Sequence, residues 1–348
     1  MRTAAAVLAL AALLAVPALL AVPAVRVYRW EAGSVGPRPS PVALPPDGVA
    51  LGARAVEFAS PDGATLRGWL VPSRNGAAVV VCHGTLATRA SMWPEARELA
   101  AGGFGVLLFD WPTQGESGGR APWLGPSGRA ALRAAVDFVR AQPGVDPGRV
   151  GAYGFSDGGY VVAQVAAADA RLRAVALAST PADLGSEVDH EFDSPNRLRR
   201  WGARLALRTA GVDLASPSAL EVVHRIAPRP LFLLAVAGDP VVSSADARRL
   251  FARAGEPKAL WIVAGATHGA YATHAPTFGA RLRDFFARGL GARVSAAPVA
   301  RLHGPAPIYR PTSAPSPLVW GGSARRRRDT APPAHVGRPR PSHRAPPR

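Results

Sequence analysis

The stretch at residues 150–161 constrains the fold of this chain more than any other. It reads Val-Gly-Ala-Tyr-Gly-Phe-Ser-Asp-Gly-Gly-Tyr-Val. Its central part, Gly154 to Gly158, matches the Gly-x-Ser-x-Gly pattern of a sharp turn that lifts a serine hydroxyl off the end of a strand. An apolar run precedes the turn, and the segment that follows it, Tyr160–Ala168, contains no helix breaker. Strand, turn and helix in this order predict that Ser156 is a nucleophile carried by a sheet with helices packed on it.

A second match to the same pattern, Gly115 to Gly119, lies in a different context. It follows Pro112 and precedes Pro122, and no helix-like segment begins before about residue 127. Because a nucleophile turn needs a helix directly after its serine, we expect Ser117 to have a role in a loop.

Short apolar runs alternate with helix-like segments throughout residues 51–290. Strands are expected at 55–58, 65–71, 77–82, 104–109, 149–153, 172–178, 231–237 and 259–263. Helices are expected at 94–101, 128–141, 159–168, 245–254 and 276–287. Continuous apolar strands separated by helices indicate an α/β fold with a mostly parallel sheet covered on both faces. The interval 179–228 lacks a clear strand, and it is either a helical lid over the site or a crossover that does not touch substrate.

Segments of different composition flank this domain. The apolar run Ala4–Val25 is long enough to cross a bilayer, so residues 1–30 are interpreted as a membrane anchor or, alternatively, as the cleaved signal peptide of a secreted protein. Residues 31–50 are rich in proline and glycine and are interpreted as a linker. The tail, 291–348, is rich in proline and arginine and is expected to be disordered.

The charge of the chain is unevenly distributed. The formal net charge is +17, and the tail alone holds 11 arginines against one acidic residue, Asp329. The folded part is therefore not expected to bind nucleic acid. A single cysteine, Cys82, excludes a disulfide within the chain, and its place at the end of an apolar run predicts a buried thiol.

Asp239 and His268 directly follow the strands expected at 231–237 and 259–263. In open α/β sheets, ligands and reacting groups collect at the carboxyl ends of the strands. Nucleophile, acid and base in this chain order accompany the serine turn described above. We therefore expect His268 to accept the Ser156 proton and Asp239 to hold the imidazole in the required tautomer.

Acyl transfer at a serine also needs backbone N–H groups that stabilise an oxyanion. One is expected from Asp157, directly after the nucleophile, and the other from the loop after the third strand. In that loop Thr85 is the candidate donor and Leu86 its alternative. His83 has no partner at a metal-ligand spacing, so no metal site is expected.

Taken together, these motifs resemble those of the α/β-hydrolase superfamily, and the resemblance extends over residues 57–290. The residues that carry it are His83, Gly84, Asp110, Gly115–Gly119, Asp146–Gly159, Gly265, His268 and Gly269. They are similar to the branch that includes dienelactone-hydrolase-like, acyl-peptidase-like and membrane-anchored hydrolases. The resemblance implies an eight-stranded, mostly parallel sheet, and the interval 179–228 is then expected to be a short helical insertion after the sixth strand. It also implies cleavage of an ester, amide or thioester without a cofactor.

Among these reactions we expect a carboxylesterase-like serine hydrolase that acts on a small-molecule ester through an acyl-enzyme. One alternative is an acyl-peptide hydrolase or aminopeptidase-like activity. Another is a membrane-tethered scaffold with little turnover, against which a complete set of three catalytic residues argues. The sequence does not indicate the substrate or the oligomeric state.

Overall fold

The computed structural model describes residues 22, 24–192, 197–212, 214 and 216–294. Of the apolar run Ala4–Val25 in the predicted membrane anchor only residues 22, 24 and 25 are described, and the tail is described only as far as residue 294. In this described part of the chain, no helix is long and apolar enough to cross a membrane. Both terminal assignments therefore stay predictions.

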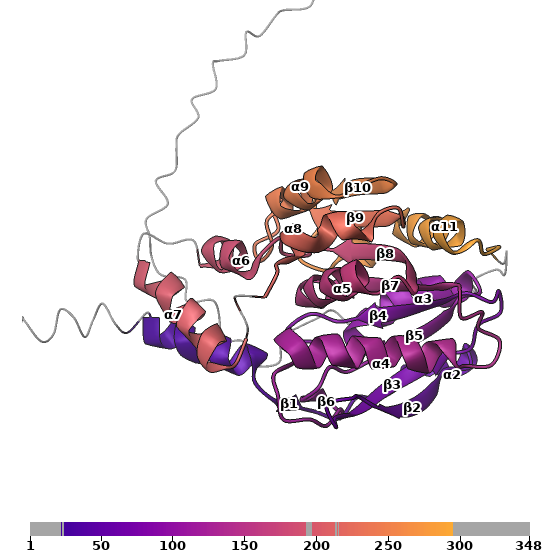
Figure 1. Ribbon diagram of the computed structural model, residues 1–348, viewed down its shortest axis with the longest axis horizontal. Coiled ribbons are helices and arrows are strands. Elements are labelled where there is room, and N and C mark those ends of the chain that lie inside the picture. The colour runs from indigo at the N-terminus through magenta and orange to yellow at the C-terminus, as the bar shows by residue number, and fades with distance from the viewer. Residues whose placement is uncertain (1–21, 23, 193–196, 213, 215, 295–348) are drawn as a thin grey trace, which may run out of the picture. The chain divides into compact units, whose positions relative to one another are not determined.

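An eight-stranded sheet forms the centre of the fold (Figure 1). Its strands are β2 (Arg54–Ala59), β3 (Thr65–Val71), β4 (Ala78–Cys82), β5 (Gly105–Phe109), β7 (Val150–Phe155), β8 (Leu172–Ala178), β9 (Leu231–Val236) and β10 (Lys258–Val263). Their order across the sheet is β10-β9-β8-β7-β4-β5-β3-β2. All neighbouring pairs are parallel except β2–β3 and β3–β5, which are antiparallel. The sequence-based prediction of a mostly parallel eight-stranded sheet is confirmed.

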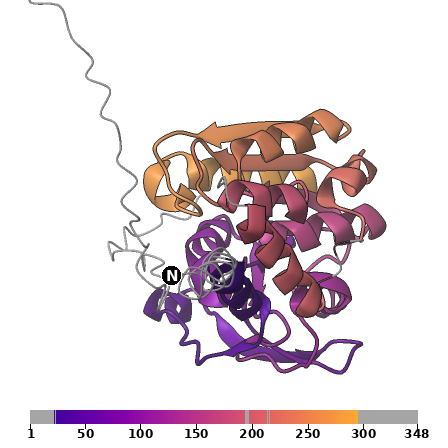
Figure 2. The same cartoon turned by 90° about the vertical axis from the view of Figure 1, so that its left-hand side faces the viewer.

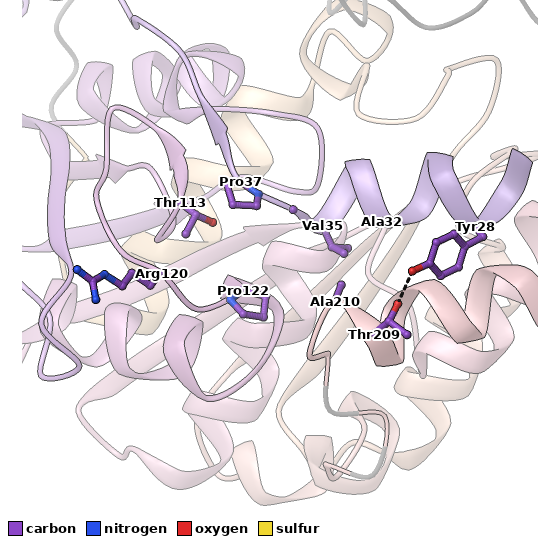
Figure 3. Close-up of a pocket in the computed structure, with 10 residues that line it drawn as sticks. Tyr28, Ala32, Val35, Pro37, Thr113, Arg120, Pro122, Thr209 and Ala210 are labelled. Atoms are coloured by element: carbon purple, nitrogen blue, oxygen red, sulfur yellow. Dashed lines mark hydrogen bonds between the residues drawn. The ribbon is translucent and has the colours of Figure 1, made fainter. Parts of the chain in front are cut away.

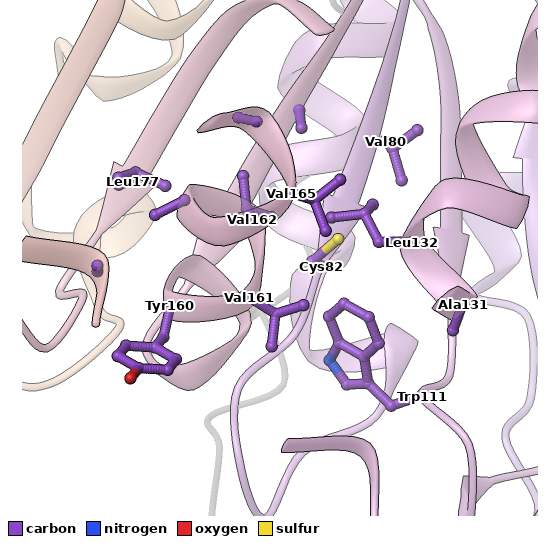
Figure 4. Packing of buried hydrophobic residues seen from close by; sticks show 14 of the residues in the cluster. Val80, Cys82, Trp111, Ala131, Leu132, Tyr160, Val161, Val162, Val165 and Leu177 are labelled. Carbon is purple, nitrogen blue, oxygen red and sulfur yellow. The ribbon is translucent and has the colours of Figure 1, made fainter. Parts of the chain in front are cut away.

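Helices pack on both faces of this sheet. One face carries α4 (Gly128–Arg140), α5 (Asp157–Ala168) and α9 (Ser244–Arg253), and the other carries α3 (Trp93–Ala101) and α11 (Phe278–Leu290). Figure 4 shows the first of the two apolar layers, in which Val161 and Val165 of α5 lie near Leu132 of α4. Cys82 is fully buried in this layer, and burial raises the pKa of its thiol above the ordinary value. The strands read as continuous apolar runs because both of their faces are covered.

Residues 31–50 differ from the linker that their composition suggests. They include the end of a helix at 24–35, the short strand β1 (Arg38–Pro39) and α2 (Pro46–Ala50). β1 pairs with β6 (Gln114–Gly115). Val35 and Val42 are buried, and the Val42 amide donates to the Glu116 carboxylate at 3.2 Å. This correction has a simple physical reason: buried apolar side chains and the pairing of β1 with β6 fix the segment to the domain, and a proline- and glycine-rich composition does not reveal such contacts.

The described residues of the interval 179–228 include several short helices, which form two groups. α8 (Ala219–Val222) and the 3-10 turn η3 (Val223–Ile226) pack against α5. α6 (Leu184–Glu191) and α7 (Arg197–Thr209) contact each other instead. α7 lies beside the helix at 24–35, where Tyr28 and Thr209 share a hydrogen bond of 3.0 Å between their hydroxyls (Figures 1 and 2).

The remaining short elements connect strands to these helices. They are η1 (Arg89–Met92) after β4, the turn η2 (Trp123–Ser127) before α4, and α10 (Tyr271–His274) after β10. Apart from η2, they lie in loops that follow the carboxyl ends of the strands, where the predicted site residues also lie.

Candidate active site

Ser156 lies between the end of β7 and the start of α5, in a backbone conformation that residues with a side chain rarely adopt. Its φ is +54° and its ψ is −130°, and its amide donates to the carbonyl of Ala178 at 2.8 Å. A Cβ at Gly154 would come within 2.5 Å of the Gly159 backbone, and a Cβ at Gly158 would collide with the carbonyl of His83. A strained non-glycine residue persists only where its surroundings determine it fully, and such strain clusters at functional sites.

The three predicted catalytic residues lie within hydrogen-bonding distance of one another. His268 Nε2 is 3.2 Å from Ser156 Oγ, and His268 Nδ1 is 2.8 Å from Asp239 Oδ2. Because an ionised carboxylate only accepts hydrogen bonds, Nδ1 carries the proton and Nε2 is left to accept one from the serine. The arrangement is the one that activates a serine hydroxyl.

Asp239 is 2% exposed, and its other oxygen, Oδ1, accepts the amides of Val241 and Val242 at 2.9 and 3.1 Å. Burial alone favours the neutral acid. The hydrogen bond from His268 and those from the two amides outweigh burial, so the pKa of Asp239 is lowered below its ordinary value. The carboxylate is therefore ionised at neutral pH.

Phe155, which the sequence analysis did not single out, supports the imidazole. The ring centroids of Phe155 and His268 are 4.7 Å apart. Gly269 has φ +77°, and a Cβ there would come 2.8 Å from the Phe155 ring. The turn that carries Ser156 and the loop that carries His268 are thus in contact through an aromatic ring.

The two predicted oxyanion donors, Thr85 and Asp157, are joined by their side chains. Thr85 Oγ1 donates a hydrogen bond to Asp157 Oδ2. A Cβ at Gly84 would come 2.7 Å from the Ser156 Cβ, so the backbone of this loop runs directly beside the nucleophile. Leu86, the alternative donor, follows with φ +60°. The loop after β4 and the first turn of α5 therefore meet at Ser156.

Ser117 and His83 have structural contacts. Ser117 Oγ donates to the carbonyl of Asp110 at 2.7 Å and accepts the amide of Arg67 at 2.9 Å. His83 is buried, contacts the carbonyl of Gly84 through Nδ1 at 2.8 Å, and accepts the Trp111 amide at Nε2. Over the described ranges, no group of three or more His, Cys, Asp and Glu side chains is placed to hold a metal ion.

A cavity of about 270 Å³ lies between the helix at 24–35, the loop at 113–122 and the end of α7 (Figure 3). Tyr28 and Thr209 are on one side of it, and Arg120 is on the other. None of the three catalytic candidates lines it, so it is separate from the site described above.

Two buried carboxyl groups that sequence reasoning missed, Glu31 and Glu187, interact with Asp157, directly after the nucleophile. Burial, followed by repulsion from Glu191 and Asp157, raises the pKa of Glu31 to about 8. Burial and then repulsion from Asp157 raise the pKa of Glu187 well above its ordinary value, and its carboxyl group hydrogen-bonds that of Asp157. Burial also raises the pKa of Asp157. These groups come from the assumed linker and from the insertion, where no motif marked them.

Glu31 gives the free energy of unfolding a dependence on pH. The carboxyl group ionises near pH 4.5 in the unfolded chain and near pH 8 in the folded one. Between these values the folded state holds a proton that the unfolded state has released, so stability falls by up to about 1.4 kcal/mol per pH unit as pH rises. Glu31→Gln removes this slope. In urea denaturation at pH 5, 6.5 and 8, the free energy of unfolding of the variant, relative to that of the natural protein, is expected to increase with each rise in pH.

Glu57→Gln is the matched control for this measurement. Glu57 pairs with Arg67 at 2.8 Å, and both side chains are about half exposed. Its variant should follow the pH dependence of the natural protein. Identical slopes for Glu31→Gln and the natural protein would contradict the burial of Glu31.

The eight-stranded sheet and the sharp turn that carries Ser156 between β7 and α5 are together typical of an α/β hydrolase. The sequence profile of the α/β hydrolase fold matches residues 77–202. The uncharacterized protein MT2364 of Mycobacterium tuberculosis is 32% identical over 239 residues, which are 68% of this chain and 77% of that protein. YfhR of Escherichia coli is 28% identical over 227 residues, 62% of this chain and 73% of YfhR.

A solved structure agrees in fold. The esterase Pf2001 of Pyrococcus furiosus superimposes with a TM-score of 0.63 at 22% identity, covering 74% of this chain and 99% of that one. The chain belongs to the α/β-hydrolase family.

Proposed function

We propose that this protein is a serine hydrolase that cleaves a small-molecule ester through an acyl-enzyme. The observation that carries the proposal is the continuous contact from Asp239 through His268 to Ser156. Each contact has the donor and acceptor that general-base activation of a serine requires. The strained turn at Ser156 and the membership of the family support the same reaction.

In the first half of the reaction, Ser156 Oγ bonds to the ester carbonyl carbon while its proton moves to His268 Nε2. The carbonyl electron pair moves onto oxygen, which the amides of Asp157 and Thr85 stabilise. The tetrahedral intermediate then collapses, the bond to the alcohol oxygen breaks, and the alcohol leaves with the proton from His268. An acyl group remains on Ser156.

In the second half, water takes the place of the alcohol. His268 Nε2 accepts a proton from the water as its oxygen bonds to the acyl carbon, and returns that proton to Ser156 Oγ when the acid leaves. Asp239 stays ionised throughout. It holds the Nδ1–H tautomer and offsets the charge of the imidazolium that forms twice in each cycle.

Covalent labelling with a fluorophosphonate tests the nucleophile. The label is expected on the peptide that contains Ser156 and is expected to be absent from Ser156→Ala, because phosphonylation needs an activated hydroxyl. Labelling of His268→Ala should be strongly slowed. Ser117→Ala is the matched control, since it removes the serine of the other Gly-x-Ser-x-Gly sequence, and it should label like the natural protein.

The outcome of this experiment separates the remaining possibilities. Label on Ser117 would show that the other turn carries the nucleophile. A folded protein that takes no label would favour the non-catalytic scaffold. A p-nitrophenyl ester and the p-nitroanilide of the same acyl group then distinguish an esterase from an acyl-peptide hydrolase or aminopeptidase-like enzyme, and we expect faster cleavage of the ester.

A further inference from the structure

Two buried hydroxyl groups extend the hydrogen-bonded chain beyond Asp239. Ser179 Oγ donates to Asp239 Oδ2 at 2.9 Å, on the same oxygen that His268 contacts. Ser179 Oγ and the Tyr271 hydroxyl are hydrogen-bonded to each other in turn. Ser179 is 2% exposed and Tyr271 is fully buried. The serine-hydrolase reaction described above requires neither residue, and no sequence motif indicates them.

The available hydrogens fix the direction of these bonds. An ionised carboxylate only accepts, so the single hydroxyl hydrogen of Ser179 is directed at Asp239. Tyr271 must then donate to Ser179 Oγ. Because each bond in such a series polarises the next, the tyrosine strengthens the bond that Ser179 gives to Asp239.

The backbone around both residues is fixed as well. Ser179 follows β8 with φ +40°, a strained value for a residue with a side chain, and its amide donates to the carbonyl of Leu234 on β9 at 2.9 Å. Tyr271 begins α10 three residues after His268, and its ring stacks on Phe278 with centroids 5.9 Å apart. The pair of hydroxyls thus joins the end of β8 to the loops that carry Asp239 and His268.

We propose that Ser179 and Tyr271 are positioning residues, which hold Asp239 ionised and fix the loop of His268 against it. This inference rests on the proposed function, because it assigns a role toward the same acid and base. Neither hydroxyl touches substrate. Their effect passes through the Asp239 carboxylate, which accepts four hydrogen bonds in all.

Other titratable groups lie near the hydrogen-bonded groups Tyr271, Ser179, Asp239 and His268. An experiment that varies pH must separate their titration from the effect of the two hydroxyls. Glu95 of α3 and Tyr153 of β7 lie within electrostatic reach of Tyr271. Burial raises the pKa of Glu95 to about 7 and the pKa of Tyr153 well above its ordinary value.

Near the other end of the cluster, His190 of α6 donates to the Asp239 backbone carbonyl at 2.8 Å. Asp157 and Glu191 lie within electrostatic reach of His268. These groups remain unchanged in Tyr271→Phe, Ser179→Ala and their double variant, so differences between these variants report the hydroxyl pair.

The test compares Tyr271→Phe, Ser179→Ala and the double variant. Loss of a donor leaves more negative charge on Asp239 Oδ2, which strengthens its hold on the imidazolium. The acid limb of the profile of kcat/KM against pH should move up by roughly half a unit to one unit, and kcat should fall about three- to tenfold, with KM unchanged. Since Tyr271 acts through Ser179, the double variant should match Ser179→Ala alone.

A spectroscopic measurement tests the hydrogen-bonded chain from Tyr271 through Ser179 to Asp239 independently of turnover. The low-field proton resonance of His268 Nδ1–H reports its bond to Asp239, and we expect it to move further downfield in each variant. Tyr153→Phe is the matched control, because it removes a buried tyrosine hydroxyl with no hydrogen-bond partner in the described part of the chain. It should change neither the resonance nor the profile.

Two results would overturn the inference: an unmoved resonance in both single variants, or losses that add in the double variant. A shifted resonance in a protein that takes no fluorophosphonate label would support the positioning role of Ser179 and Tyr271 and reject the proposed function. Thermal unfolding by circular dichroism verifies that each variant is folded, and the conservative Tyr271→Phe retains the ring that packs on Phe278.

Discussion

Ser156→Ala, His268→Ala and the double variant are each expected to lower kcat for p-nitrophenyl acetate by the same factor, on the order of 10⁴- to 10⁶-fold. The serine hydroxyl is a weak nucleophile until the imidazole takes its proton, and the imidazole does no chemistry without the serine. Removal of either residue therefore removes the contribution of both. Initial rates over the spontaneous hydrolysis of the ester measure this loss.

Two further variants calibrate the result. Ser117→Ala should retain kcat within about twofold, because the Ser117 hydroxyl bonds backbone groups and has no contact with His268 among the described residues. Asp239→Asn should lower kcat by about 10⁴-fold, since an amide at this position favours the wrong tautomer. Losses that add in the Ser156/His268 double variant would contradict a joint role, and so would a His268→Ala protein with a tenth of the natural rate.

The central fold and the placing of the three catalytic candidates could be predicted from the sequence for a definite physical reason. Strands buried on both faces must be apolar throughout, so their ends are visible as the points where polar residues and glycine begin. Asp239 and His268 stand directly after such ends. A parallel sheet brings those ends to one edge, so residues far apart in the chain meet without any further signal.

The surroundings of the site could not be predicted in this way. Glu31 approaches Asp157 and Glu191 because the helix at 24–35 packs beside the insertion, and a contact across so many residues has no periodicity in the sequence. Ser179 and Tyr271 act through single hydroxyl groups, which any loop contains. Proline and glycine at 31–50 suggested a linker, but composition does not reveal that Val35 and Val42 are buried.

The buried position of Arg89 could not be predicted either, because no sequence pattern distinguishes a buried arginine from an exposed one. Its amide donates to Asp110 Oδ1 at 2.7 Å, and its guanidinium contacts Asp110 Oδ2 and Glu116 Oε2. The guanidinium carbon lies 4.7 Å from the centre of the Trp69 ring. The side chains of Arg89 and Asp110 are 3% and 0% exposed. The group fixes the loop after β4, which also carries Thr85, to the loop after β5.

Arg89→Met is expected to lower the free energy of unfolding by about 3–5 kcal/mol, because it leaves the Asp110 carboxylate buried without its cation. Arg67→Met is the matched control: it breaks an ion pair whose two side chains are about half exposed, and its loss should be about 1 kcal/mol or less. Urea denaturation at one pH measures both.

The double variant Arg89→Met/Asp110→Asn should recover part of the loss, since it leaves no unpaired charge at the centre of the group. Equal losses for Arg89→Met and Arg67→Met would show that the buried pair contributes no more than a surface pair. The loops beside Ser156 would then be held by the apolar contacts of Trp69 and its neighbours.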